Sequence, residues 1–472
     1  MSIKALGKQS LIYGVGHVMA RLITFLLLPL YTHAFTQVEY GALSLAYAFM
    51  GFALIIYRYG MDTALMKYSV QRSGQNRKKY ITIIVGVQAI TGILFTLLLY
   101  LSRNFTAVYV LGIDRPDWMI YLAVILFFDS MWNLPMLILR SEERAGPFIS
   151  FNLLNVILTM VLNILFVVYW DNGIEGVFKA NIIASSSVFF FSLPIILKRI
   201  ELNLFEKEAF INIMKFALPF LPAGIFTMIM ELSDRYLLEY YLGTAEVGLY
   251  SAGKKMGMLG LTVVMGFNMG WTPYFLKRGK QNGARIEFSK ITTLFLGIMG
   301  YVTVLVSIWI SNIMRLPIGD RTLIGSEFWA CEQVVSTILI GYFFFATYVI
   351  QLPGVYMKEI TSWVPIFRIV GASSLILSSV FFIPIFGYLG AAYAVVLAFI
   401  LMSMSIYFRT NKIYPISYNW RGVLYPIFFL IAIQFHIDDL VARVFISILY
   451  PALWYAVVIN KEEKTGLKRL FK

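Results

Sequence analysis

The chain has few of the residues from which catalytic and metal centres are commonly built. Its 472 residues include one cysteine and three histidines, and only 14% of them are charged. The lone Cys331 excludes a disulfide within the chain and a cysteine-only metal site. His17, His33 and His436 lie far apart in the sequence and form no ligand cluster. We therefore expect neither a metal nor a cofactor.

Hydrophobic residues, by contrast, are abundant. They make up 59% of the chain, and the mean hydropathy is +0.76. Soluble domains contain about 45–50% apolar and about 25% charged residues. A water-soluble fold cannot bury this much apolar surface, so the solvent around most of the chain must be lipid.

Long apolar runs recur along the whole chain, each long enough to cross a bilayer as a helix. The fourteen predicted spans are 10–34, 41–66, 80–101, 118–139, 148–170, 176–197, 216–241, 247–272, 288–310, 328–350, 361–384, 388–408, 421–436 and 441–459. Strands of a membrane barrel are shorter and alternate strictly, so helices are favoured. The first run continues to about Ala34, which favours a membrane helix over a cleaved signal. The last two runs are short, and a re-entrant pair remains an alternative for them.

The distribution of lysine and arginine predicts the orientation. If the N-terminus is cytoplasmic, the cytoplasmic segments hold 27 of the 39 basic residues and the external loops hold six. This asymmetry obeys the positive-inside rule and places both termini in the cytoplasm. It also explains the net charge of +14 through contact with anionic membrane lipids, without nucleic acid.

The external loops are too short to hold a catalytic domain. The longest are "SRNFTAVYVLGIDRPD" and "SNIMRLPIGDRTLIGSE". We therefore predict that the protein is not an enzyme. A membrane-embedded polysaccharide polymerase, ligase or acyltransferase is kept as an alternative.

An internal repeat appears when the sequence is shifted by 207 residues. "FTQVEYGALS" (35–44) then lies on "LGTAEVGLYS" (242–251), and "GIEGVFKA" (173–180) resembles "GYLGAAYA" (387–394) at a slightly larger shift. Such repeats are typical of transporters. We predict an N-terminal six-helix lobe (1–200), a C-terminal six-helix lobe (201–410), and two accessory helices with a basic cytoplasmic tail (411–472).

The stretch "GLYSAGKK" (248–255) resembles a phosphate-binding loop but departs from it at Lys255, where a Ser or Thr is needed. The segment before it reads as a membrane helix and a tight external turn rather than a buried strand. Gly248 and Gly253 are better interpreted as small residues that let helices approach closely.

Six basic residues fall inside predicted helices, where an uncompensated charge costs a few kcal/mol or more. The candidate substrate-binding cations are Arg21, Arg58, Arg235, Lys254, Lys255 and Arg368. The candidate acids for gating or ion coupling are Asp62, Asp129, Glu231 and Asp234. This excess of cations suits an anionic ligand such as a phosphate.

Each of these charges also has a structural interpretation. Arg58 and Asp62, like Glu231 and Arg235, are four residues apart, so that each pair can neutralise itself on one helix face. The two adjacent lysines can reach the membrane interface, although neighbouring helical residues point about 100° apart. Asp129 is either a protonated acid or a site that couples a proton or sodium ion.

Several asparagines also fall in the apolar runs. Asn152, Asn155, Asn163 and Asn181 can meet sugar hydroxyls or form hydrogen bonds between helices, and both uses stay open.

Two stretches carry a family resemblance. "KFALPFLPAGIFTMIMELSDRYLLEYYLGTAEVGLYSAGKK" (215–255) resembles the seventh-to-eighth helix region of bacterial polysaccharide-repeat flippases, in the multidrug/oligosaccharidyl-lipid/polysaccharide exporter superfamily. The cues are a proline-bearing helix, then D-R-Y, V-G-L-Y and G-K. "QSLIYGVGHVMARLITFLLLPLYTHAFTQVEYGALSL" (9–45) resembles the family's first two helices. Arg235 and Lys254 are the charged residues that match the motif.

The resemblance implies two six-helix lobes around a central basic cavity, with two accessory helices. It implies that a polyprenyl-pyrophosphate-linked oligosaccharide crosses a bacterial plasma (inner) membrane by alternating access without ATP, for O-antigen, capsule or exopolysaccharide assembly. The implied partners are this lipid-linked oligosaccharide, polysaccharide assembly proteins, and a coupling H+ or Na+. A cation-coupled multidrug exporter of the same superfamily is the alternative transporter.

Overall fold

The structure is a computed structural model that describes residues 25–201, 205–360, 362–433 and 439–459. The chain forms two compact units, residues 1–248 and 249–472. Helices dominate both units. The short antiparallel hairpin of β1 (Pro317–Ile318) and β2 (Arg321–Thr322) supplies the strands of the described part.

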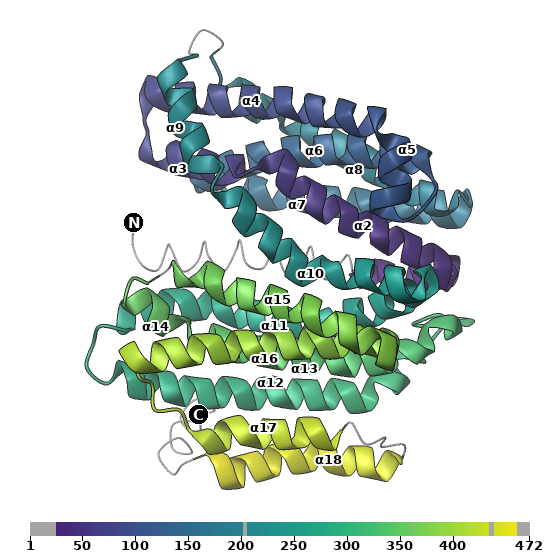
Figure 1. Ribbon diagram of the computed structural model, residues 1–472, viewed down its shortest axis with the longest axis vertical. Coiled ribbons are helices and arrows are strands. Elements are labelled where there is room, and N and C mark those ends of the chain that lie inside the picture. The colour runs from purple at the N-terminus through teal and green to yellow at the C-terminus, as the bar shows by residue number, and fades with distance from the viewer. Residues whose placement is uncertain (1–24, 202–204, 361, 434–438, 460–472) are drawn as a thin grey trace. The chain divides into compact units, whose positions relative to one another are not determined.

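The first unit contains a helix over Phe25–Ala34 and most of the elements up to residue 248. In chain order they are α2 (Gln37–Arg58), α3 (Met61–Gln71), α4 (Gly74–Leu101), α5 (Arg103–Phe105), η1 (Thr106–Leu111), α6 (Pro116–Ser141), α7 (Ala145–Asn163), η2 (Ile164–Tyr169), α8 (Gly173–Leu197), α9 (Lys207–Ala217) and α10 (Phe220–Leu242). Within this unit α4, α6 and α8 run side by side, and α9 packs across the ends of α3 and α4 (Figure 1).

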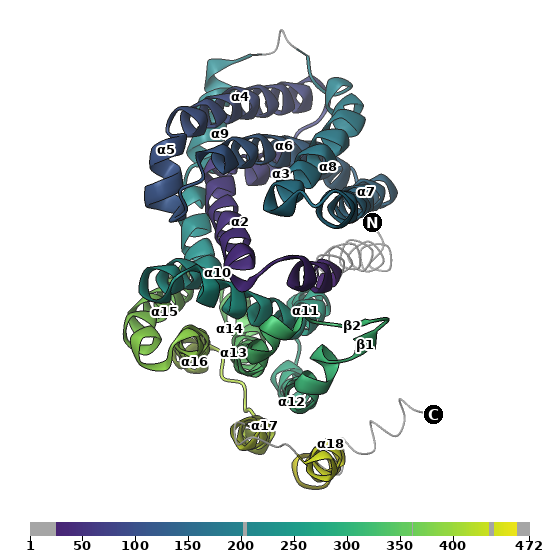
Figure 2. The ribbon, with the colours of Figure 1, turned by 90° about the vertical axis from the view of Figure 1, so that its right-hand side faces the viewer.

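The second unit begins inside α11 (Thr244–Arg278). Its further helices are α12 (Ala284–Met314), η3 (Ser326–Cys331), α13 (Glu332–Val349), α14 (Leu352–Met357), α15 (Trp363–Phe386), α16 (Tyr388–Ile413), α17 (Trp420–Ala432), α18 (Leu440–Leu453) and η4 (Trp454–Val458). The pair α17 and α18, yellow in Figures 1 and 2, lies along α12 at the margin of this unit.

The predicted all-α polytopic architecture is confirmed. Eleven helices of the described part are long and apolar enough to cross a membrane. Two shorter apolar helices, Phe25–Ala34 and Trp420–Ala432, and the 35-residue α11 account for the other predicted spans. The apolar runs thus located the helices of the described part, while residues 10–24, 361 and 434–436 of the predicted spans lie outside the described residues.

Local signals explain where α2 begins and where it ends. Thr36 caps the helix: its hydroxyl accepts from Glu39 N at 3.3 Å, while Thr36 N donates to the Glu39 carboxylate at 2.9 Å. The helix ends at Arg58 because Tyr59 and Gly60 take positive φ of 28° and 85°. A Cβ at Gly60 would lie 2.1 Å from Ala217 O, so only glycine permits this approach of α9.

This break differs from the prediction of one continuous helix over 41–66. The seventh predicted span, 216–241, is also interrupted near its start, since α9 ends at Ala217 and α10 starts at Phe220 after Pro219. The two breaks lie against each other and enclose one apolar cluster, which includes Met61, Leu65 and Ile213. Mean hydropathy over a whole span did not reveal them, because each break occupies only two residues within a long and mostly apolar run.

The predicted repeat has a direct structural counterpart. A Cβ on Gly41 would lie 1.9 Å from Thr244 O, and a Cβ on Gly248 would lie 1.9 Å from Gln37 O. The contact is therefore reciprocal at the shift of 207 residues: each glycine faces the backbone at the first residue of the other helix. The interpretation of Gly248 as a close-approach residue is confirmed.

Candidate functional site

Two of the candidate charged residues of the first unit, Arg58 and Asp62, lie at helix ends rather than in the middle of a helix. Arg58 occupies the last turn of α2 and Asp62 the first turn of α3. Each charge thus complements the dipole of its own helix end. The interpretation in which the two charges share one helix face is wrong, because the helix breaks between them at Tyr59 and Gly60.

Arg58 instead approaches the fourth span. Its Nη2 donates to the backbone oxygen of Asp129 in α6 at 3.4 Å. The Asp129 carboxylate accepts two further hydrogen bonds, from Ser185 Oγ at 2.6 Å and from Trp132 Nε1 at 3.0 Å. A cation, a carboxylate and two neutral donors therefore meet among α2, α6 and α8. We call Arg58, Asp129, Trp132 and Ser185 the Asp129 centre.

Two asparagines bind tyrosines on neighbouring helices of the same unit. Tyr31 donates to Asn163 Oδ1 at 2.8 Å, and Asn181 Nδ2 donates to the hydroxyl of Tyr47 at 2.9 Å. Asn152 donates to a carbonyl of its own helix, that of Phe148. For Asn163 and Asn181 the structure thus matches the interpretation as hydrogen bonds between helices.

The charges of α10 lie in one continuous helix, as predicted. Asp234 is fully buried, and its carboxylate accepts from Arg235 N at 3.0 Å. Arg235 is half-buried, and Glu231, one turn earlier, is exposed. A buried acid in a membrane helix is retained at a cost, so Asp234 is a candidate for function or for a specific packing role.

The candidate cations of the second unit lie on α11 and α15. Lys254 is only 5% exposed, and its ammonium lies 5.7 Å from the centre of the Tyr250 ring. Lys255 and Arg368 are half-buried. The backbone beside Lys254 is held tightly, because a Cβ on Gly253 would lie 2.7 Å from Val334 Cβ. This confirms that Gly253 serves close helix packing. Arg21 lies outside the described residues.

A charged clamp joins three helices of the first unit on the side predicted to be cytoplasmic. Glu142, which follows α6, accepts from Arg77 at the start of α4 at 2.9 Å, and Arg199 after α8 grips both of its carboxylate oxygens. Partial burial alone would raise the pKa of Glu142, but the bonds from Arg199 and Arg77 outweigh it and hold this pKa below its ordinary value. We call these three residues the Glu142 clamp.

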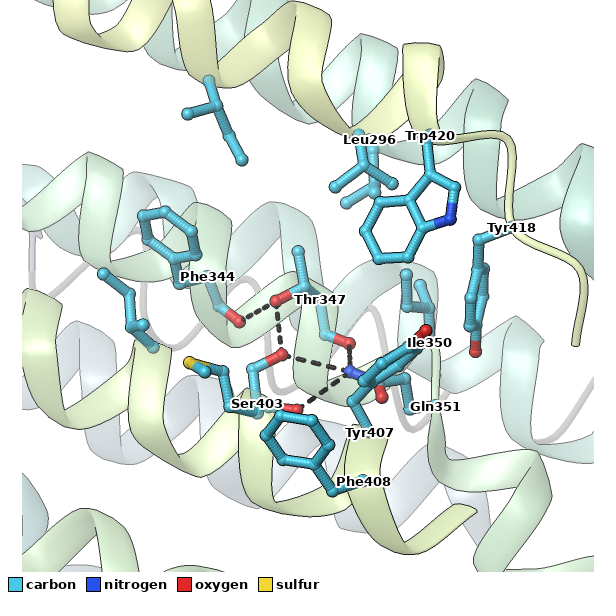
Figure 3. A pocket seen from close by; sticks show the side chains of 14 residues that line it. Leu296, Phe344, Thr347, Ile350, Gln351, Ser403, Tyr407, Phe408, Tyr418 and Trp420 are labelled. Atoms are coloured by element: carbon cyan, nitrogen blue, oxygen red, sulfur yellow. Dashed lines mark hydrogen bonds between the residues drawn. The ribbon is translucent and has the colours of Figure 1, made fainter. Parts of the chain in front are cut away.

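The second unit contains a cavity of about 400 Å³, walled by α12, α13, α16 and α17 (Figure 3). It is lined by Leu296, Phe344, Thr347, Ile350, Gln351, Ile400, Ser403, Met404, Tyr407, Phe408, Tyr418, Trp420, Val423 and Ile427. None of these side chains is charged at neutral pH. We call this cavity the α17 pocket.

Helix ends position the polar and aromatic groups of the α17 pocket. Pro353 has no N–H to offer the carbonyl of Val349, where α13 ends, so Gln351 falls between α13 and α14. Asn419 caps α17 by accepting from Arg421 N at 3.1 Å, which makes Trp420 the first residue of that helix.

Sequence reasoning missed Ser185, Trp132 and Gln351 as site residues. Ser185 and Trp132 carry no signal of their own, because serine and tryptophan are common in membrane helices. Gln351 does carry one: it is a lone amide in an apolar run, two residues before a proline.

Known proteins resemble the chain in sequence and in fold. A family model described as "Polysaccharide biosynthesis protein" matches residues 6–278. The Haemophilus influenzae "Lsg locus putative protein 1" is 22% identical over 356 residues, which cover 72% of this chain and 84% of that protein. A second membrane protein of that species is 24% identical over 353 residues, or 72% and 83% of the two chains.

Solved structures share the fold. The lipid II flippase MurJ in an inward closed conformation superimposes with a TM-score of 0.74 at 15% identity, covering 95% of this chain and 98% of MurJ. An inward-facing multidrug resistance MATE family transporter of the MOP superfamily gives a TM-score of 0.65 at 14% identity, covering 88% and 99%. At these identities the likeness concerns the fold alone.

Proposed function

The chain belongs to the family of polysaccharide biosynthesis proteins, and from that premise we propose that it is a flippase. It moves polyprenyl-pyrophosphate-linked oligosaccharide repeat units across a bacterial plasma membrane by alternating access, for O-antigen, capsule or exopolysaccharide assembly. The fold shared with MurJ and the MATE transporter supports transport rather than enzymatic chemistry, since both of those proteins are named for moving molecules.

The observation that carries the proposal is the burial of ionisable groups inside helices of the transport fold. Asp234 is fully buried and Lys254 is 5% exposed, although charges in membrane helices are costly. We propose that Arg21, Arg58, Arg235, Lys254, Lys255 and Arg368 compensate the pyrophosphate, while the prenyl chain stays in lipid. Once the substrate leaves, these cations form ion pairs with the acids Asp62, Glu231 and Asp234.

Asp129 has a separate role in this proposal. Its carboxylate accepts hydrogen bonds from two donors, and Arg58 donates to its backbone oxygen, so a proton or sodium ion bound at Asp129 would change the contacts of three helices. We propose that this ion coupling at Asp129 supplies directionality without ATP. Both termini are cytoplasmic in this proposal.

The test is charge reversal in a strain that depends on this protein for its surface polysaccharide. Arg235→Glu and Lys254→Glu are each expected to abolish surface glycan while the protein remains in the membrane. Lys358→Glu, at an exposed residue after α14, is the matched control and keeps glycan display. Normal display in both site variants would refute the role of these cations.

The multidrug exporter is the second candidate, because the α17 pocket is aromatic and has no basic lining residue. A deletion strain distinguishes the two. Loss of surface glycan with unchanged susceptibility to cationic drugs supports the flippase, and the reverse result supports the exporter.

A further inference from the structure

The α17 pocket contains one polar group whose orientation is imposed by its surroundings. Gln351 Nε2 donates to Thr347 O at 2.7 Å, to Ser403 O at 3.3 Å and to Ser403 Oγ at 3.1 Å (Figure 3). Two of these partners are backbone carbonyls, which only accept. The amide therefore cannot be reversed, and its oxygen must face away from Thr347 and Ser403.

This oxygen is an acceptor that the described residues leave unused. Gln351 is 5% exposed, and its Oε1 is buried and accepts no hydrogen bond within the described part of the chain. A buried acceptor without a donor costs free energy, which a donor carried by a ligand recovers. Because Gln351 lines the pocket, this unused acceptor lies in the pocket wall, just beneath its surface.

Aromatic rings gather on the same side of the pocket. Tyr407 lies between the other two rings: its ring centroid is 5.9 Å from that of Trp420 and 6.4 Å from that of Tyr418. Ring faces carry partial negative charge, so they attract cations, and best when the site is desolvated. The rings and the amide oxygen thus favour the same kind of group, a positively charged hydrogen-bond donor.

We propose that the α17 pocket binds an amphiphile that carries an alkylammonium group. The ammonium donates to Gln351 Oε1 and lies against Tyr407, Tyr418 and Trp420. Its hydrocarbon chain runs along the aliphatic wall formed by Met404, Val423 and Ile427.

The composition of the lining excludes the closest competing ligands. No charged side chain of either sign lines the pocket, so a carboxylate or phosphate would have no counter-charge and would meet the negative ring faces. An ammonium has no counter-charge there either, but the ring faces and the Gln351 oxygen attract it. A neutral alcohol can donate to Gln351 but gains nothing from the charge preference of the rings. The α17 pocket is therefore proposed to bind a cationic ligand, whereas the basic residues named above are proposed to bind the anionic pyrophosphate. The two proposals do not depend on each other.

Two sources carry this chemistry, an aminophospholipid of the membrane and a free amphiphilic amine. Arg421 follows Trp420 directly and is exposed. It supplies a counter-charge outside the pocket for the phosphate of an aminophospholipid, which makes both sources compatible with the site.

The test measures radiolabelled dodecylamine bound by the full-length protein in nanodiscs of phosphatidylcholine and phosphatidylglycerol, above the amount bound by empty nanodiscs. We expect saturable binding that unlabelled dodecylamine displaces and that dodecanol and dodecanoate displace at least tenfold less well. Gln351→Leu is expected to weaken binding at least tenfold, which is the loss of a single charge-assisted hydrogen bond. Tyr407→Leu is expected to weaken amine binding as well. It tests the same pocket in case Gln351→Leu does not fold.

Gln88→Leu is the matched control. Gln88 is also a fully buried amide, but it lies in the first unit, donates to Ser130 O at 3.0 Å and does not line the pocket. Binding by this variant is expected to equal that of the wild type. If dodecanol and dodecanoate displace the amine equally well, or if both pocket variants bind normally, the ammonium site is refuted.

Lipid competition then identifies the source. Replacing phosphatidylcholine by phosphatidylethanolamine is expected to suppress amine binding if the natural ligand is a membrane aminophospholipid. Unchanged binding assigns the site to free amphiphilic amines. Neither outcome depends on glycan display, so failure of the flippase proposal and failure of this one are distinguishable.

Discussion

Both units are built from helices, but the polar groups described within them differ in chemistry. The first unit holds the Asp129 centre, and the Glu142 clamp ties together the ends of its helices. The second unit has a neutral pocket whose polar contacts are amide and hydroxyl bonds around Gln351. A helix bundle thus tolerates either interior, provided that each buried donor and acceptor finds a partner or a ligand.

Gly41 and Gly248, which the shift of 207 residues superimposes, make the same contact. Both glycines allow a helix start to touch the backbone of the other helix. This contact depends on the absence of a side chain, whereas the interior chemistry depends on which side chains are present. The two stretches related by the shift of 207 residues thus make the same kind of backbone contact.

The largest effect is expected from filling that contact. Gly248→Ala places a Cβ 1.9 Å from Gln37 O, and a backbone atom cannot rotate away. We expect the free energy of unfolding to fall by about 3 kcal/mol, which is measured as a lower melting temperature of the purified protein in detergent.

Gly41→Ala should cost a similar amount, and the double variant should lose less than the sum, because the two sites share one contact. Gly86→Ala in α4 is the control, since a Cβ there meets nothing within 4 Å. Equal melting temperatures for all three single variants would contradict the contact.

A variant of the Glu142 clamp tests whether charged contacts stabilise the first unit. Glu142→Gln is expected to destabilise the protein by about 2 kcal/mol at pH 7, because it leaves two partly buried arginines without their carboxylate. Since the folded pKa of Glu142 is lowered, its stabilisation is present above the ordinary value of 4.5 and is lost as the pH falls through the lowered value.

Melting temperatures of wild type and variant should therefore converge under acid conditions. Glu143→Gln is the neighbouring control outside the clamp. A difference between wild type and Glu142→Gln that is independent of pH would contradict the electrostatic origin.

The Asp129 centre tests whether the polar interior serves transport. Asp129→Asn keeps the size of the side chain but removes its charge. We expect surface glycan to fall at least tenfold, which corresponds to about 1.4 kcal/mol. Quantitative glycan staining at matched protein level measures this loss.

Asp439→Asn provides the matched control, because Asp439 caps α18 and asparagine caps helices equally well. Full glycan display by Asp129→Asn would remove ion coupling at this residue from the proposal.

The smallest effect is expected from a single neutral hydrogen bond in the second unit. Tyr414, whose hydroxyl donates to Gly279 O at 2.9 Å, is buried. Tyr414→Phe should cost about 1 kcal/mol and lower the melting temperature by a few degrees. Tyr240→Phe, at a residue 81% exposed, should change nothing, and an equal shift in both variants would count against the bond.

Prediction from sequence succeeded where one physical property decides the outcome. Hydropathy located the described spans, and the small size of Gly248 and Gly253 in an apolar run indicated their close helix contacts. It failed at Arg58 and Asp62, because a helix break between them depends on how closely α9 approaches Gly60. Ser185 could not be assigned either, since its partner Asp129 is 56 residues away in the chain.

The sequence by itself determined that the chain is helical and membrane-embedded, and it pointed to the close approach of helices at Gly248 and Gly253. These properties follow from the apolar length of each run and from the small residues within it, both of which are local. Only the tertiary structure decided which polar groups meet, such as Ser185 with Asp129 or Gln351 with Ser403. Such contacts join residues that are distant in the chain, and their direction depends on helix breaks and rotations that hydropathy does not encode.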